Sequence, residues 1–234
     1  MDTPLEQRLA AYRDPAWRAS TQRTLETARV FRVDWDAMTV AESPTHPELN
    51  GMPITRLARD RGVEPLAAVI DLSLEDDLDT RFRSILANDD EDMIEKLLQH
   101  PGMLIGLSDA GAHVSQLCDA CLPTDLLGNW VREREVLTLE RAVHKLTGEP
   151  AGVYGFDGRG EVREGMKADI TVFDPDTVAP GGLHRIRDFP ADGERLVADE
   201  PSGVRHVVVN GTPIRVDEQP VPEANESRPG RVLR

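Results

Sequence analysis

The residues with the clearest chemical potential are Ser108 and Asp109, which end an apolar run that begins at Met103. A short apolar run of this kind is typical of a strand that is buried on both faces of a parallel sheet. A carboxylate at the C-terminal end of such a strand lies where enzymes built on parallel barrel strands keep their active sites. The small residues 110–112 would allow the backbone or a substrate to approach closely, although an Asp that only caps the next turn fits the same pattern.

Two further groups could do chemistry close to this pair. His113 could contact a substrate, or it could be a polar loop residue. Cys118 and Cys121 have the spacing of redox and zinc-knuckle motifs, but the sequence has no second Cys-x-x-Cys pair to complete a zinc site and no preceding thioredoxin-like strand. The chain has six histidines, and none of them forms a His-x-His or His-x-x-x-His pattern. A metal site made by paired histidines is therefore not expected.

The elements around this pair are expected to form a strand, a helix and a second strand. Residues 82–87 are expected to form a strand that ends at Asn88, and a helix is expected to continue to about Gln99. Pro101-Gly102 would end that helix before a strand over 103–108. A crossover of about this length favours parallel pairing. Asn88 and Asp109 would then lie at the same edge of the sheet.

Helices are expected on both sides of this unit. The patterns over 53–61 and 64–78 predict two helices, each with a Pro near its first turn, where Pro is tolerated. Thr138 has the side chain of a helix N-cap and precedes the apolar positions of a further helix.

From residue 155 onward the pattern changes to short strands and turns. Asn210-Gly211 lies between the apolar runs 204–209 and 212–216. Such a pair predicts a type I′ hairpin, because both central residues of that turn need a positive φ. The sequence therefore predicts an α/β chain with a β-rich end.

Composition limits the classes of function. The 234 residues carry a net charge of −15, from 42 acidic residues against 27 Lys and Arg. This charge argues against nucleic acid or an anionic membrane as a partner. The sequence contains no apolar run that could cross a bilayer and begins without a signal-peptide pattern. With only two cysteines, a reducing cytoplasm is the expected location.

Three stretches together resemble the C-terminal half of the amidohydrolase superfamily, in its N-acyl-D-amino-acid deacylase (D-aminoacylase-like) branch. GLSDAGAH over 106–113 is similar to the end of the eighth strand of the family's (β/α)8 barrel. LTLERAVHKLT over 137–147 is similar to the closing helices. GEVREGMKADITVFDP over 160–175 is similar to the return into a small β-sandwich. We accordingly expect residues 1–154 to belong to the barrel, with an inserted helical segment, and residues 155–234 to the sandwich and tail.

The resemblance implies a metal-dependent hydrolase, usually with zinc, that hydrolyses the amide bond of N-acyl-D-amino acids. Metal-activated water would attack the amide carbonyl. Asp109 would be the general base, and also a metal ligand if the intact site uses it so. Ser108, His113 and Asn88 are the candidate contacts for this small-molecule amide substrate.

Part of the family pattern is missing from the chain. The first-strand His-x-His pair is absent, as are the middle-strand ligands. A complete barrel takes roughly 250 residues, whereas only residues 1–154 precede the β-rich end. We therefore expect a truncated amidohydrolase. The isolated chain is expected to bind no zinc and to associate with an upstream half-barrel chain or with a second copy of itself. The alternatives are a cyclic-amide hydrolase of the hydantoinase or dihydroorotase type, and a non-catalytic scaffold or partner subunit.

Overall fold

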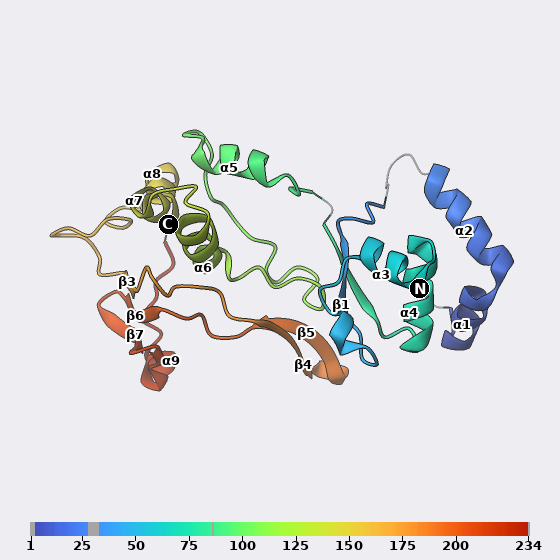
Figure 1. Ribbon diagram of the computed structural model, residues 1–234. Helices are drawn as coiled ribbons and strands as arrows, with labels where there is room; N and C mark the ends of the chain where they lie inside the picture. The colour runs from blue at the N-terminus through green and yellow to red at the C-terminus, as the bar shows by residue number, and fades with distance from the viewer. Residues whose placement is uncertain (1–2, 28–32, 86, 234) are drawn as a thin grey trace. The chain divides into compact units, whose positions relative to one another are not determined.

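The computed structural model describes residues 3–27, 33–85 and 87–233. The chain is a mixed α/β structure that divides into two compact units, Met1–Glu91 and Asp92–Arg234. Figure 1 shows the helices and strands of both units. Within the described ranges, no helix has the length and apolar character needed to cross a membrane.

The N-terminal unit combines helices with a small antiparallel sheet. Its elements are α1 (Leu5–Arg13), α2 (Pro15–Thr27), β1 (Met38–Glu42), the 3-10 helix η1 (Pro47–Leu49), α3 (Ile54–Arg61), α4 (Pro65–Glu75) and β2 (Arg81–Ser84). Strands β1 and β2 pair antiparallel, with Met38 opposite Ser84. An ion pair joins α2 to α4, because Arg18 Nη1 lies 2.7 Å from Asp71 Oδ1. The helices predicted near 53–61 and 64–78 are confirmed as α3 and α4.

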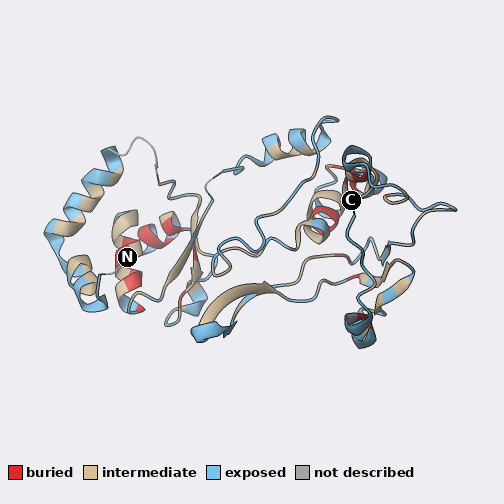
Figure 2. Ribbon diagram, turned by 180° about the vertical axis from the view of Figure 1, so that it is seen from behind, coloured by how far each residue is buried: buried red, intermediate tan, exposed pale blue. Residues whose placement is uncertain are grey.

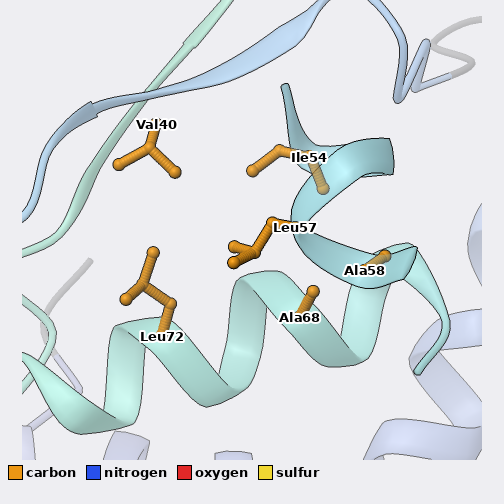
Figure 3. Close-up of a cluster of buried hydrophobic side chains, with 6 residues drawn as sticks. All are labelled: Val40, Ile54, Leu57, Ala58, Ala68 and Leu72. Carbon is orange, nitrogen blue, oxygen red and sulfur yellow. The ribbon is translucent and has the colours of Figure 1, made fainter. Parts of the chain in front are cut away.

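The core of the N-terminal unit lies between the sheet and the α3–α4 pair. Figure 3 shows the apolar side chains of these elements pointing toward one another. Burying these side chains removes apolar surface from water, which is the main stabilising term in folding. The buried residues are Val40, Ile54, Leu57, Ala58, Ala68 and Leu72.

A buried carboxylate closes the end of helix α4. Asp76 is 5% exposed. Its Oδ2 accepts a hydrogen bond from Ser43 Oγ at 2.7 Å, and its Oδ1 accepts one from the Thr45 amide at 3.0 Å. The hydroxyls of Thr45 and Thr80 also donate to this carboxylate. Burial alone would raise the pKa of Asp76, but these hydrogen bonds lower it to about 2.

The C-terminal unit contains the remaining helices and two antiparallel sheets. Helix α5 (Glu91–Gln99) starts at the boundary, and the larger sheet has the strand order β3-β6-β7-β8, while β4 pairs with β5. The other elements are α6 (Leu122–Asp125), the π-helix η2 (Leu126–Glu133), α7 (Leu139–Leu146), α8 (Gly148–Tyr154), β3 (Ile170–Phe173), β4 (Leu183–Phe189), the 3-10 helix η3 (Pro190–Asp192), β5 (Gly193–Ala198), β6 (Val204–Val209), β7 (Thr212–Val216), β8 (Gln219–Pro220) and α9 (Pro222–Ser227).

The core of this unit forms where η2 and α7 meet the segment around Val178. Figure 2 shows buried residues on these helices. Gly128 allows the close approach, because a Cβ at this position would lie 2.7 Å from the Val178 carbonyl oxygen. The same carbonyl accepts a 2.5 Å hydrogen bond from Arg132 Nη1. The buried members of the core are Leu126, Leu127, Leu137, Ala142 and Val178.

Two local predictions are confirmed in this unit. The β6–β7 hairpin closes through Asn210 and Gly211, whose φ angles are 46° and 81°, and Val209 lies opposite Thr212. The side chain of Thr138 caps α7 by accepting a hydrogen bond from the Arg141 amide at 3.2 Å. Both features depend only on residues close in sequence, so their chemistry could be recognised without knowledge of the fold.

The parallel strand-helix-strand unit expected over 82–109 is wrong, although its central helix is confirmed as α5. Strand β2 pairs antiparallel with β1, and residues 103–108 form no strand. The partner strand β1 belongs to the same unit as β2 and packs on the same core. The Met103 carbonyl accepts instead from the Lys145 side chain. The expected burial of this run is also wrong, because Met103, Leu104 and Leu107 are 42%, 36% and 99% exposed. A run of apolar residues therefore determines neither the burial of a segment nor the strand with which it pairs.

Candidate functional site

The candidate base Asp109 lies in a turn that follows the extended segment 103–108. Asp109 is exposed, and its carbonyl accepts the Ala112 amide at 3.0 Å. Ser108 Oγ accepts the Ala110 amide at 3.3 Å. Gly111 completes the turn with a φ of 90°. The small residues after Asp109 therefore form a tight turn, which leaves the carboxylate at the surface of the C-terminal unit.

His113 continues this turn and is also exposed. Its φ is 48°, and its carbonyl accepts the amides of Gln116 and Leu117 at 2.7 and 3.2 Å. The next residues are attached to the β4–β5 hairpin, because the Ser115 carbonyl accepts from Arg185 Nη1 at 2.7 Å. The Val114 carbonyl also accepts the Leu196 amide at 2.7 Å. These contacts hold the loop that carries His113, and the sequence alone did not reveal them.

Asn88 follows β2 in the N-terminal unit, whereas Ser108, Asp109 and His113 belong to the C-terminal unit. Asn88 is exposed and has a φ of 57°. The strand end that Asn88 and Asp109 were expected to share is absent, because neither residue follows a parallel strand. Three of the four candidate residues are thus neighbours along one segment, and the substrate-contacting role of Asn88 stays a prediction.

A buried lysine anchors the start of the Asp109 segment. Lys145 on α7 is 1% exposed, and its Nζ donates to the Met103 carbonyl at 2.6 Å. Nζ also lies 3.4 Å from Glu149 Oε2, and Glu149 Oε1 accepts from Arg141 Nη2 at 3.0 Å. This lysine was not identified from the sequence. The Lys145–Glu149 spacing of four residues was the available signal, because it would place both side chains on one face of a continuous helix. In the structure, Lys145 lies in α7 and Glu149 in α8.

A cavity of about 480 Å³ lies beside Ser108 in the C-terminal unit. Its polar lining consists of Ser108, Asp119, Cys121 and Asp125. Burial raises the pKa of Asp125, against the effect of hydrogen bonds from Asn129 and Trp130. The apolar lining is supplied by Ile94, Leu98, Ile105, Leu122, Leu126 and Trp130.

The cysteine pair contributes one residue to this cavity. Cys118 and Cys121 are both free thiols, and Cys121 Sγ lies 3.9 Å from the Cys118 carbonyl oxygen. Burial raises the pKa of the Cys121 thiol, and nearby carboxylates act in the same direction. A thiol with a raised pKa is a poor nucleophile and a poor metal ligand, because both roles need the thiolate.

Comparison with known proteins decides the family. A profile described as the amidohydrolase family matches residues 5–215, a range that includes Asp109, Lys145 and most of the β-rich end. This chain belongs to the amidohydrolase family.

Several curated relatives of this amidohydrolase chain are named as deacylases or aminoacylases of D-amino acids. The chain is 33% identical over 208 residues to N-acyl-D-glutamate deacylase of Alcaligenes xylosoxydans xylosoxydans, covering 85% of this chain and 36% of the relative. It is 31% identical over 170 residues to D-aminoacylase of the same organism, covering 72% of this chain and 31% of the relative. The amidohydrolase chain therefore spans about a third of the length of these relatives.

Solved structures of amidohydrolases give weaker matches. A crystal structure of D-aminoacylase is 26% identical with a TM-score of 0.46, and the match covers 79% of this chain and 36% of that one. N-acyl-D-glutamate deacylase from Bordetella bronchiseptica, complexed with zinc and a phosphonate inhibitor, is 28% identical with a TM-score of 0.42. That match covers 85% of this chain and 38% of the other.

The metal-ligating side chains that the structure describes in this amidohydrolase chain do not fit a catalytic zinc ion. Such a site takes three protein ligands and keeps a position open for water. Across residues 3–27, 33–85 and 87–233, no group of three or more His, Cys, Asp or Glu side chains could hold a metal ion. Asp109 is exposed and belongs to no such group of ligands among the described residues.

Proposed function

We propose that this chain is the C-terminal part of an amidohydrolase that cleaves the amide bond of N-acyl-D-amino acids. The observation that carries the proposal is the family match over residues 5–215, together with relatives named as deacylases of this substrate class. Within the complete enzyme, residues 1–154 would belong to the (β/α)8 barrel and residues 155–234 to the β-sandwich. The two free cysteines agree with a reducing compartment such as the cytoplasm.

Asp109 is proposed as the general base of the reaction. Its carboxylate would take a proton from the attacking water and pass that proton to the amide nitrogen as the C–N bond breaks. The exposed position of Asp109 at the surface of the C-terminal unit leaves it accessible to a substrate. Ser108 and His113 lie in the same turn and are proposed to contact the substrate, as is Asn88.

The metal ligands are proposed to come from residues outside this chain. A partner that carries the remaining barrel strands, such as an upstream half-barrel chain, would provide them. Zinc is the expected metal of the assembled site, in line with the zinc complex of the Bordetella bronchiseptica deacylase. A partner subunit without catalysis of its own is the second candidate, since Asp109 is the one proposed catalytic group and no described cluster holds a metal.

The test is to express the chain alone and together with an N-terminal amidohydrolase fragment that carries the metal ligands. Zinc content and amine release from N-acetyl-D- and N-acetyl-L-amino acids are then measured for both preparations. The proposal predicts D-selective hydrolysis and bound zinc in the combined preparation and neither in the chain alone. A stable complex that binds zinc but hydrolyses no amide would favour the partner-subunit function.

A further inference from the structure

The cavity beside Ser108 has the size and lining of a ligand site. Its volume of about 480 Å³ falls within the roughly 300–1,000 Å³ that is usual for small-molecule pockets. Three separate parts of the unit supply its apolar wall: Ile94 from α5, Ile105 from the Asp109 segment, and Leu122 from α6. Trp130 on η2 adds an aromatic face.

The charges that line the cavity exclude one class of ligand group. Its two charged lining residues are Asp119 and Asp125, and no Lys, Arg or His is among the described residues that line it. A ligand carboxylate placed inside would be repelled and would find no cation. The cavity therefore does not suit the acidic side chain of an N-acyl-D-glutamate, although one relative carries that name.

The size of the cavity distinguishes a short apolar ligand group from a long one. A leucine-sized side chain would leave most of the cavity without contact, and an apolar void forfeits the dispersion contacts of its lining. Water is a poor alternative filler along the aliphatic wall, because it needs polar partners. A longer unbranched chain can contact all three apolar elements at once.

We propose that this cavity binds the aliphatic acyl chain of the substrate, so that the enzyme acts on medium-chain N-acyl amino acids. The assignment rests on the proposed function, because Asp109 follows Ser108 directly and would face the amide at the end of the chain. The acyl group would enter past Ser108 and lie against Ile105, Leu122 and Trp130. The amino-acid carboxylate would stay outside, away from Asp119 and Asp125.

The test is a homologous series with a constant head group: N-acetyl-, N-butanoyl-, N-hexanoyl- and N-octanoyl-D-alanine. Trp17→Phe and Trp35→Phe leave Trp130 as the remaining tryptophan of the three in the chain. Its emission then reports binding at the cavity, and equilibrium dialysis on the unsubstituted chain provides an independent Kd. We expect Kd to fall by about fourfold for each added methylene, the gain for one buried CH2. A Kd independent of chain length would overturn the proposal.

Substitutions of residues that line the cavity test whether the dependence of Kd on acyl-chain length arises there. Leu122→Gln and Ile105→Gln should flatten the chain-length dependence, whereas Val162→Gln should leave it unchanged, because Val162 is exposed and outside the cavity. The two lining positions lie on different elements, so misfolding of one variant leaves the other as the test. Unchanged chain-length dependence in both folded lining variants would place the acyl site elsewhere.

Two further ligands test whether the cavity binds an acyl chain, an amino-acid side chain or a free fatty acid. N-acetyl-D-leucine should bind more weakly than N-octanoyl-D-alanine, and the reverse order would assign the cavity to an amino-acid side chain and overturn the proposal. Octanoate should also bind more weakly, whereas a tighter Kd for octanoate would make this a site for free fatty acids instead. Binding is measured without turnover, so its failure leaves Asp109-dependent hydrolysis intact, and lost hydrolysis leaves the binding result intact.

Discussion

The ammonium group of Lys145 lies 2.6 Å from the carbonyl oxygen of Met103, although the two residues are 42 positions apart in sequence. Lys145 is nearly inaccessible to solvent, so the contacts with this carbonyl and with Glu149 replace the water that would otherwise surround its ammonium group. The contact joins helix α7 to the start of the segment that ends at Asp109. The position of the candidate base thus depends on a buried charge outside the turn that carries it.

Replacing this lysine should destabilise the C-terminal unit. Lys145→Ala leaves the Met103 carbonyl without its donor and Glu149 without its cation, for an expected loss of about 3 kcal/mol in unfolding free energy. Lys167→Ala is the matched control, because Lys167 is exposed, and a surface change of this kind stays within about 0.5 kcal/mol. Urea unfolding followed by Trp130 fluorescence, in a chain that also carries Trp17→Phe and Trp35→Phe, measures both variants. Equal midpoints would show that the Lys145 contact contributes nothing.

Asp76 should make the N-terminal unit sensitive to acid. Its pKa falls from 3.8 in the unfolded chain to about 2 in the folded one, so the folded state favours the charged carboxylate. The stabilisation is therefore complete above about pH 4 and is lost as the pH falls through 2. We expect about 2 kcal/mol from this group at neutral pH, lost in Asp76→Asn.

Asp79→Asn is the control for this measurement, since Asp79 is exposed in the same turn. Unfolding free energies of both variants and of the unsubstituted chain are compared at pH 7 and at pH 3. Asp76→Asn should show a shallower decline with acid than the unsubstituted chain, and Asp79→Asn should follow the unsubstituted chain. A steep decline that persists in Asp76→Asn would assign the acid sensitivity to other carboxylates.

Gly211 should matter through its backbone conformation alone. Its φ is 81°, and a Cβ at this position would meet no atom within 4 Å. Gly211→Ala should therefore cost roughly 1–2 kcal/mol from the left-handed conformation. Gly152→Ala lies inside α8, where an added Cβ also meets nothing, and should be stabilising by about 0.5–1 kcal/mol. Thermal unfolding shows whether the two substitutions act in opposite directions, as this difference in backbone conformation requires.

Local features of the fold could be predicted because their causes lie within a few residues. The Thr138 cap and the Asn210-Gly211 turn each depend on side chains or φ angles inside one short stretch. Strand pairing has no such local cause, because apolar runs do not specify a partner, and the antiparallel pairing of β1 with β2 was missed. The Asp76 network joins residues 31 or more positions apart along most of its bonds, so sequence patterns gave no sign of it.

The candidate site also combines features with local causes, which could be predicted, and features with long-range causes, which could not. Ser108 and Asp109 could be selected as candidates because a polar pair follows an apolar run, and the structure places both in one turn. Their roles stay predictions. The cavity beside Ser108 could not be found, because α5, the 103–108 segment, α6 and η2 supply its lining together. Lys145 was also missed, because a lysine on a helix is ordinarily solvated.

The measurement that tests the central claim most directly is kcat/KM for an N-acyl-D-amino acid with Asp109→Asn in the assembled enzyme. Asp157→Asn is the matched control, because Asp157 is an exposed carboxylate elsewhere in the C-terminal unit. We predict that Asp109→Asn lowers kcat/KM by about 10²–10⁴-fold, the usual contribution of a general base, while bound zinc and the Asp157→Asn rate stay unchanged. Full activity in Asp109→Asn, or zinc-dependent hydrolysis by the isolated 234-residue chain, would contradict the account.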